Sequence, residues 1–539
     1  MQLPLLDIVV IAVYIVVTVL FGSWFVRRSR TTDGFTRAGG RVPMAVVGLS
    51  IFGTFVSSIS FLAIPGKAFA SNWNSYVWSL TLLPATWVAA RYFVPFYRSR
   101  GHISTYAHLE SRFGTWARVY ASVCYMVTQI ARMGAVMFLV ALPLNLLLGW
   151  DIVKIILVIG ILTTLYSMLG GIEGVVWTDA LQSLILILGT LLCTGILLFG
   201  TPGGPEQVFK IAVEQNKFSL GSFDSSISQS TFWVVLIYGI AINLQNFGID
   251  QNFVQRYQTA RSDKDARRSL WLNAWLYIVV SAFFFFIGTA LYSFYTAQPE
   301  SLPAEMLADM NARPIAHGDQ FYPFFIIHQL PAGLTGLLIA AIFSAAMSTI
   351  STSLNGCATL TLTDFYKRFY RPNAGAKEEV TVLYVSTAIW GGLGIGGGLL
   401  FTHAKQILDA WWGIQGIFGG GILGLFLLGF FSRRAKNVPA VIGTVLGLLV
   451  IAWMSLSLPS WKIFPERWAA WRSPFHEFLI PVIGTAVIFL SGFLLTMLFA
   501  PFKGKKLPAG KSSAPRDGAL DDTTMPDDAT TPDDTAPRD

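Results

Sequence analysis

Residues 48–66 read GLSIFGTFVSSISFLAIPG, which places glycine and hydroxyl side chains inside a run long enough to span a bilayer. The small polar residues gather at Gly53, Thr54, Ser57 and Ser60. In hydrocarbon, such residues are tolerated at close helix contacts or where an unwound backbone faces a cavity. The density of hydroxyls beside glycine favours an unwound stretch, with tight helix packing as the alternative.

The whole chain has the composition of a polytopic membrane protein. Of its 539 residues, 53% are hydrophobic and 13% are charged, whereas soluble domains carry about 25% charged residues. This apolar content excludes a disordered chain. With only 3 Cys, a disulfide-stapled secreted module is excluded as well.

We expect an all-α membrane protein with about thirteen transmembrane helices, because a helix needs about 20 apolar residues to cross the hydrocarbon. The predicted spans are 6–26, 44–70, 75–97, 115–148, 152–169, 179–200, 231–255, 269–296, 333–362, 379–402, 407–432, 438–458 and 477–501. No basic region precedes the first run, so it is interpreted as an uncleaved span and not as a signal peptide.

Basic residues fall in alternate loops and therefore predict the orientation. Clusters follow the first, third, seventh, ninth, eleventh and last spans, and the seventh is followed by Arg256, Arg261, Lys264, Arg267 and Arg268. By the positive-inside rule these loops are cytoplasmic, the N-terminus is outside and the C-terminus is inside. The net charge of +8 then reflects topology and does not indicate a nucleic-acid partner. We expect a membrane domain over 1–502 and a disordered cytoplasmic tail over 503–539, rich in Pro, Asp and Thr.

A second interruption lies in the seventh span, where residues 243–251 read NLQNFGIDQ. So many amides would be costly against lipid, so they should face protein or water. Two interrupted helices five spans apart indicate an inverted-repeat transporter with a binding site near the bilayer midplane. Spans 2–6 and 7–11 would form the repeats, with one extra helix at each end.

The ninth span carries a hydroxyl cluster, Ser348, Thr349, Ser351 and Thr352, within AAIFSAAMSTISTSLN. These positions share adjoining sides of a helix. Neutral hydroxyl oxygens suit Na⁺ when an unwound neighbour adds backbone carbonyls, and we expect these from Gly53 and Val56. Packing alone would explain one or two of them.

Asp179 begins a long apolar run, where an unpaired carboxylate is expensive. It would complete a second cation site if it lay near 348–352. A helix N-terminal acid is an equal alternative.

Arg132 lies deep in the fourth span and stays charged there. Its planar fork suits a bidentate carboxylate, which favours a carboxylated substrate. The alternative is an internal ion pair with Asp179 or Asp250.

These segments, together with GGIEGVVWTDALQ and DQNFVQRY, resemble the sodium:solute symporter family from about residue 3 to 500. Within the family they are most similar to the bacterial sodium/sialic acid symporters. The resemblance implies a LeuT-like 5+5 core and alternating access. It implies a first sodium site at Gly53, Val56, Ala345, Ser348 and Thr349, and a second at Asp179, Ser348, Ser351 and Thr352.

The resemblance also implies a set of substrate contacts. They are Arg132 for a carboxylate, Ser57 and Ser60 for hydroxyls, and Phe55, Ser79, Asn246 and Phe247 as further contacts. Phe55 and Ser79 stand where those relatives have a threonine and a glutamine, so the sugar site is expected to differ locally.

We therefore expect a Na⁺-coupled symporter in a bacterial-type inner membrane that imports a carboxylated sugar such as sialic acid. The alternative is a neutral sugar or polyol, with Arg132 structural. The expected partners are the solute, Na⁺ as coupling ion and lipid, with no other cofactor and no nucleic acid. The six His are scattered without metal or nucleophile spacing, and no Walker loop occurs, so we expect neither an enzyme nor an ATP-driven pump.

Overall fold

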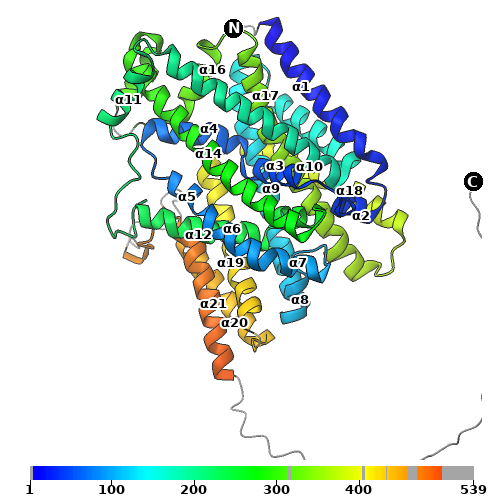
Figure 1. The fold of residues 1–539 in the computed structure, drawn as a ribbon. Coiled ribbons are helices and arrows are strands. Elements are labelled where there is room, and N and C mark those ends of the chain that lie inside the picture. The colour runs from blue at the N-terminus through cyan, green and yellow to red at the C-terminus, as the bar shows by residue number, and fades with distance from the viewer. Residues whose placement is uncertain are drawn as a thin grey trace, which may run out of the picture. The chain divides into compact units, whose positions relative to one another are not determined.

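The structure, a computed structural model, describes residues 4–312, 315, 317–402, 407–432, 434–458 and 470–499, and the predicted tail lies outside them. Within these residues the regular structure is helical, apart from one isolated bridge between Val42 and Ala260. Figure 1 shows the helices in chain order: α1 (Leu5–Ser23), α2 (Thr32–Arg37), α3 (Met44–Phe55), α4 (Ser58–Ala70), α5 (Tyr76–Leu80), α6 (Leu82–Val88), α7 (Val94–Arg100), α8 (Ala107–Phe113), α9 (Thr115–Leu148), α10 (Ile152–Gly200), α11 (Gly204–Glu214), α12 (Phe232–Ile249), α13 (Gln251–Thr259), α14 (Asp263–Ala297), α15 (Ala304–Asn311), α16 (Phe321–His328), α17 (Leu334–Leu360), α18 (Ala376–Phe401), α19 (Ile407–Phe431), α20 (Asn437–Leu456) and α21 (Leu479–Phe499).

Ten helices of the described chain are long and apolar enough to cross a bilayer, or eleven when α3 and α4 count as one bent span. The multi-pass architecture is thereby confirmed. The sequence predicts thirteen spans, and the difference from eleven arises at two places. The run 75–97 consists of the short helices α5, α6 and α7 around a π-helical turn at 89–93, and the runs 152–169 and 179–200 both fall within α10.

The unwound stretch predicted within 48–66 is confirmed. Helix α3 ends at Phe55, α4 begins at Ser58, and the two axes bend by 54°. Val56 and Ser57 between them adopt extended backbone angles. The predicted interruption in the seventh span is present too, because Asp250 has φ −79° and ψ 121° between α12 and α13.

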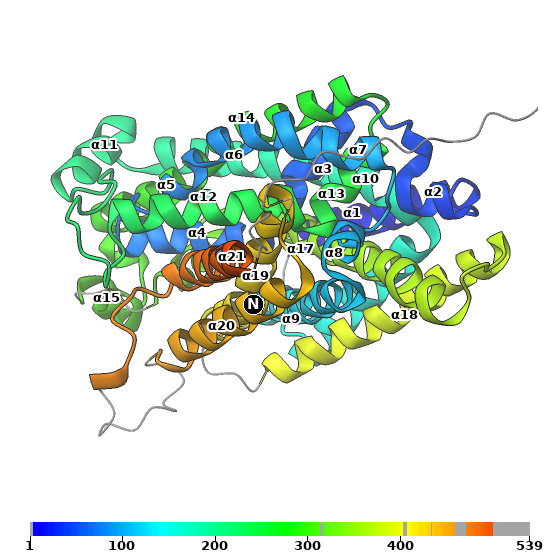
Figure 2. The same cartoon turned by 90° about the horizontal axis from the view of Figure 1, so that it is seen from below.

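Helix α17 forms the centre of the fold, and every residue from Leu338 to Leu360 is buried. Helices α1, α9, α10, α13 and α18 pack around it, as the two views in Figure 1 and Figure 2 show. A helix with no lipid-facing side can carry many hydroxyl groups, since each finds a partner inside the protein. The hydroxyl cluster of 348–352 therefore lies in the protein interior.

A network of charged groups closes the end of the molecule that carries the basic loops. Arg118 of α9 pairs with Asp364 at 2.6 Å and with Glu110 of α8 at 2.8 Å, and Arg368 reaches Glu110 at 2.7 Å. The hydroxyl of Ser122 also donates to Asp364, which is fully buried. This inner-end network joins α8 and α9 to the π-helical extension of α17 over 361–370.

Helix α10 leaves helical geometry at Gly171, where φ 55° and ψ −159° require glycine. Next to this break α10 lies directly against α1. A Cβ added at Gly170 would stand 2.4 Å from the carbonyl oxygen of Gly22. Backbone atoms cannot move aside cheaply, so a side chain here would push the two helices apart.

We predict that Gly170→Ala destabilises the protein by about 1–3 kcal/mol, the usual cost of overpacking. Gly195→Ala, in the same helix, is the matched control because nothing lies within 4 Å of the added Cβ. Thermal unfolding of the purified variants measures the difference. Equal melting temperatures would contradict the tight contact between α1 and α10.

Candidate functional site

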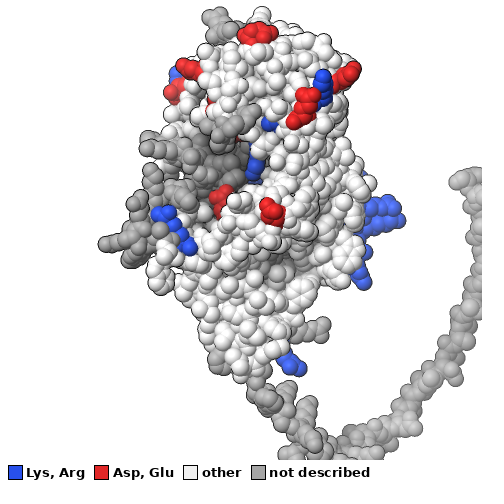
Figure 3. Space-filling view, turned by 90° about the vertical axis from the view of Figure 1, so that its left-hand side faces the viewer, with Lys and Arg blue, Asp and Glu red and all other residues white. Residues whose placement is uncertain are grey.

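A cavity of about 560 Å³ lies where the two broken helices meet. It extends outward along α4 and α5 to the hollow that Figure 3 shows in the left-hand face of Figure 1. Six of the seven predicted substrate contacts line it: Phe55, Ser57, Ser60, Ser79, Arg132 and Asn246. The cavity wall also includes Gln129, Asp250 and Tyr277 in its depth, and Lys67 and Asp319 along its length.

The break between α3 and α4 turns two helix ends toward this cavity. The carbonyl of Thr54, in the last turn of α3, accepts a hydrogen bond of 3.0 Å from Nη2 of Arg132. At the start of α4, the hydroxyl of Ser57 accepts from the backbone N–H of Ser60. A helix C-terminus attracts cations and a helix N-terminus attracts anions. The break therefore offers one end to a cation and the other to an anion.

Arg132 is half-buried, and no acidic group of the described chain lies within the 4.0 Å of an ion pair with it. Asp179, one of its two candidate partners, pairs with Arg256 instead. Asp250, the other, lines the same cavity and accepts a hydrogen bond from the N–H of Asn252 at the start of α13. The guanidinium thus retains donors that face the cavity.

Phe55 forms an aromatic wall beside the break. Its ring centroid lies 4.5 Å from that of Phe253, 5.5 Å from Tyr277 and 6.3 Å from Trp78. Phe247 was predicted as a substrate contact, but it is fully buried behind Phe55, with the ring centroids 5.4 Å apart. Phe247 therefore does not line the cavity in this structure, and its contact with substrate stays a prediction. Phe247 supports the wall without forming its surface.

Ser79 is the other residue at which the sequence led us to expect a local difference from the relatives, and it lines the cavity. Its hydroxyl is paired with that of Ser281 at 2.8 Å. A short side chain already bonded to α14 adds little polarity to the cavity, so this side of the wall is mostly aromatic.

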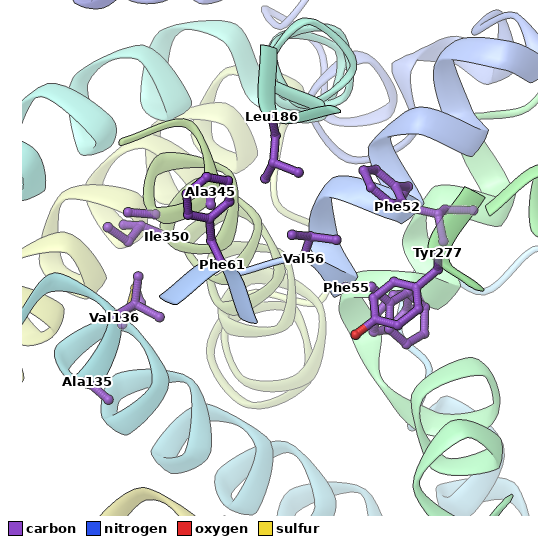
Figure 4. Close-up of a cluster of buried hydrophobic side chains, with 14 of the residues drawn as sticks. Phe52, Phe55, Val56, Phe61, Ala135, Val136, Leu186, Tyr277, Ala345 and Ile350 are labelled. Atoms are coloured by element: carbon purple, nitrogen blue, oxygen red, sulfur yellow. The ribbon is translucent and has the colours of Figure 1, made fainter. Parts of the chain in front are cut away.

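The residues of the first predicted sodium site come from helices that pack against each other. A Cβ at Gly53 would lie 3.3 Å from the hydroxyl of Ser348, so the last turn of α3 touches the hydroxyl face of α17. The Thr349 hydroxyl donates to the carbonyl of Ala345 at 3.0 Å. Figure 4 shows Val56 at the break, near the helix that carries Ala345. Hydroxyl and carbonyl oxygens of this kind are hard, neutral donors, which suit Na⁺.

The residues of the second predicted site also come together, but a protein cation lies among them. The hydroxyl of Ser348 donates to Asp179 Oδ1 at 2.7 Å, and Arg256 reaches Asp179 Oδ2 at 2.6 Å. Arg256 had been assigned to the cytoplasmic basic cluster, and that assignment is wrong for this residue, whose exposed fraction is 1%. Its position within the amide-rich helix α13, six residues after Asp250, could have set it apart from the loop arginines that follow.

Comparison with known proteins gives a consistent picture. Residues 35–447 match the model of the sodium:solute symporter family. The sodium/sialic acid symporter SiaT of Proteus mirabilis is 33% identical over 93% of this chain and 96% of its own length, and NanT of Aliivibrio fischeri is 32% identical over 92% and 93%. A solved Na⁺-coupled sialic acid symporter, in a substrate-bound outward-open state, is 31% identical and superposes with a TM-score of 0.83 over 92% of this chain and 99% of that one.

The cavity predicts a difference in thiol accessibility along α4. Ala63 lines the cavity, whereas Ala68, five residues later in the same helix, is fully buried. We expect a charged thiol reagent to modify Ala63→Cys rapidly and Ala68→Cys not at all. The three native cysteines are buried, so the unsubstituted protein serves as the blank. Equal labelling of the two variants would contradict an open cavity at this helix.

Proposed function

The chain belongs to the sodium:solute symporter family, and on this premise we propose that it imports a carboxylated sugar such as sialic acid together with Na⁺. The observation that carries the proposal is the pairing of Arg132 with the broken second span. Arg132 bonds the C-terminal end of α3 and faces the cavity into which α4 begins. A carboxylate placed there would meet the guanidinium and the N-terminus of α4 together.

The arrangement of the breaks supports a LeuT-like core of two five-helix repeats, flanked by one helix at each end. Ser57 at the first break and Asp250 at the second line the same cavity. Discontinuous helices that meet at a central site are the mark of inverted-repeat transporters. The predicted total of thirteen spans follows if 75–97 crosses the bilayer as one segmented span and α10 crosses twice, once on each side of Gly171.

We assign the end that carries the basic loops to the cytoplasm. Arg98 of α7 pairs there with Asp263 at the start of α14, and Arg261 donates to the carbonyl of Arg41. Loops that are distant in sequence thus meet at one end, as the positive-inside rule requires. The cavity opens at the other end, which corresponds to an outward-open transporter with its N-terminus outside.

Coupling would arise at the contact between α3 and α17. Na⁺ held by the carbonyls of Gly53 and Val56 and by Ala345, Ser348 and Thr349 would bridge the broken span to the central helix. That bridge would fix the cavity wall in the form that receives solute. An ion favours one state only by binding it better than the other, and a ligand shared between two moving helices meets this condition.

We predict that Ser348→Ala raises the Na⁺ concentration for half-maximal uptake by about tenfold, the effect of about 1.4 kcal/mol of lost ion binding. Ser344→Ala is the matched control, because Ser344 is equally buried one turn earlier and donates to Ala340. Since Ser348 also bonds Asp179, Thr349→Ala provides a second variant confined to the first site. Uptake into proteoliposomes at varied Na⁺ measures the effect. Equal uptake in K⁺ would refute sodium coupling.

We predict that Arg132→Gln weakens sialic acid binding by about tenfold to a hundredfold, since a hydrogen bond to a charged group contributes about 1.5–3 kcal/mol. Binding of the methyl ester of sialic acid should change far less. Arg91→Gln, which alters an exposed arginine, is the control. Equal loss of acid and ester binding would support the neutral-solute alternative, in which Arg132 is structural.

A further inference from the structure

Asp250 is an acidic group inside the membrane domain that the predicted solute contacts do not include. It lies at the break between α12 and α13, lines the cavity and is half-buried. Its Oδ1 accepts a hydrogen bond of 2.8 Å from the N–H of Asn252. Its Oδ2 has no donor within the described part of the chain and is not sealed from the cavity. A carboxylate at membrane depth with an unused oxygen indicates a binding function.

Arg132 is the group of opposite charge in the same cavity, and it too has donors to spare. Its Nη2 donates to the carbonyl of Thr54, and within the described residues no acidic group reaches it at ion-pair distance. Among the charged groups near Asp250, Arg132 exerts the strongest electrostatic effect on it, and the strongest effect on Arg132 comes from Asp250. The two charges are therefore neighbours in the cavity wall that do not form an ion pair with each other.

Hydrogen bonds on the protein side set the spacing of these two groups. Gln129, one turn before Arg132 in α9, accepts through Oε1 from Nδ2 of Asn252 at 3.3 Å. The hydroxyl of Tyr125, also in α9, donates to Asn252 Oδ1 at 2.5 Å. Helix α9 and the start of α13 are thus joined beside Asp250 as well as beside Arg132. A solute between the two charges meets a site that is already organised, which lowers the entropy cost of binding.

The chemistry of the two groups defines what such a solute must carry. A guanidinium binds a carboxylate through two parallel hydrogen bonds. An ionised carboxylate only accepts hydrogen bonds, so the group that meets Asp250 must bring a proton. Because the two protein charges are neighbours, this donor must lie close to the solute's own carboxylate. An α-hydroxy acid meets these requirements, and sialic acid is one, since its carboxylate and its anomeric hydroxyl share one carbon.

An α-amino acid would also offer a carboxylate with a donor beside it. The other polar groups in the depth of the cavity favour the hydroxy acid, because they are neutral hydroxyls and amides that suit a solute with several hydroxyl groups. They are Ser57, Ser60, Gln129 and Asn246.

We propose that Asp250 is a solute-binding residue that accepts a hydrogen bond from the anomeric hydroxyl of sialic acid while Arg132 binds the carboxylate. This inference rests on the proposed import of sialic acid and defines the form that is taken up. Asp250 selects the free acid. A glycoside has no proton on this oxygen and must be hydrolysed before import.

The first experiment uses the unmodified full-length protein. Calorimetric titration of the detergent-purified chain at saturating NaCl compares sialic acid with the deoxy analogue that lacks only the anomeric hydroxyl. We expect the analogue to bind about tenfold to a hundredfold more weakly, the effect of a lost hydrogen bond to a charged group. Equal affinities would overturn the proposal.

The second experiment changes the acceptor. Asp250→Ala should weaken sialic acid binding by the same factor and leave binding of the deoxy analogue unchanged, so that the two affinities become equal. Asp250→Asn keeps an acceptor oxygen without its charge and should retain part of the preference. Asp224→Ala, which removes an exposed acid from the loop before α12, is the control and should keep the full preference. Equal weakening of both ligands in Asp250→Ala would show a purely structural role and refute the proposal. If the variants at this position do not fold, the unmodified protein decides.

The outcomes separate this inference from the function on which it rests. No binding of sialic acid to the unmodified protein would remove the proposed function itself. Binding that depends on Arg132 but does not distinguish sialic acid from its deoxy analogue would leave that function intact and reject only the role of Asp250. L-alanine should not compete with sialic acid, and competition that disappears in Asp250→Ala would assign the carboxylate to an ammonium group instead.

Discussion

Backbone polar groups at membrane depth must find partners, and this constraint acts most strongly on the two-residue gap between α3 and α4. The gap frees carbonyl groups at the end of α3 and N–H groups at the start of α4. Arg132 takes one of these carbonyls, that of Thr54, and the Ser57 hydroxyl takes the N–H of Ser60. The cavity, the half-buried Arg132 and the hydroxyl-rich central helix together provide the polar surroundings that the backbone of this gap requires.

Much of this arrangement could be predicted from the sequence, because a polar residue inside a membrane span is costly and therefore indicates a protein contact or a cavity. The break at 48–66, the interruption at 243–251 and the hydroxyl cluster of α17 each stood out against apolar surroundings. The meeting of the two breaks at one cavity followed from the spacing of the broken spans. The structure adds that Ser57 and Asp250, about two hundred positions apart, line the same space.

The structure differs from the sequence predictions at several places, and each difference has a physical cause. Arg256 resembled a loop arginine because it begins a basic series, and only its place just after the amide-rich stretch distinguished it from the arginines that follow. The structure buries it beside Asp179. The resemblance implied Phe247 as a contact, yet its side chain is fully buried and packs against Phe55. The number of predicted spans also differs from the number of long apolar helices in the described chain. Hydropathy cannot reveal a glycine break inside one long helix or a span built from short helices.

The inner-end network of Arg118, Asp364, Glu110 and Arg368 has a consequence for solute capture. In the proposed transport cycle, opening the cavity toward the basic end would require α8 and α9 to part from the extension of α17, and this would break these charge-assisted contacts. On the proposed orientation, these contacts would favour the state whose cavity faces the exterior. Since apparent affinity scales with the fraction of molecules that are competent to bind, such a bias would raise the apparent affinity for solute on the side from which it is taken up.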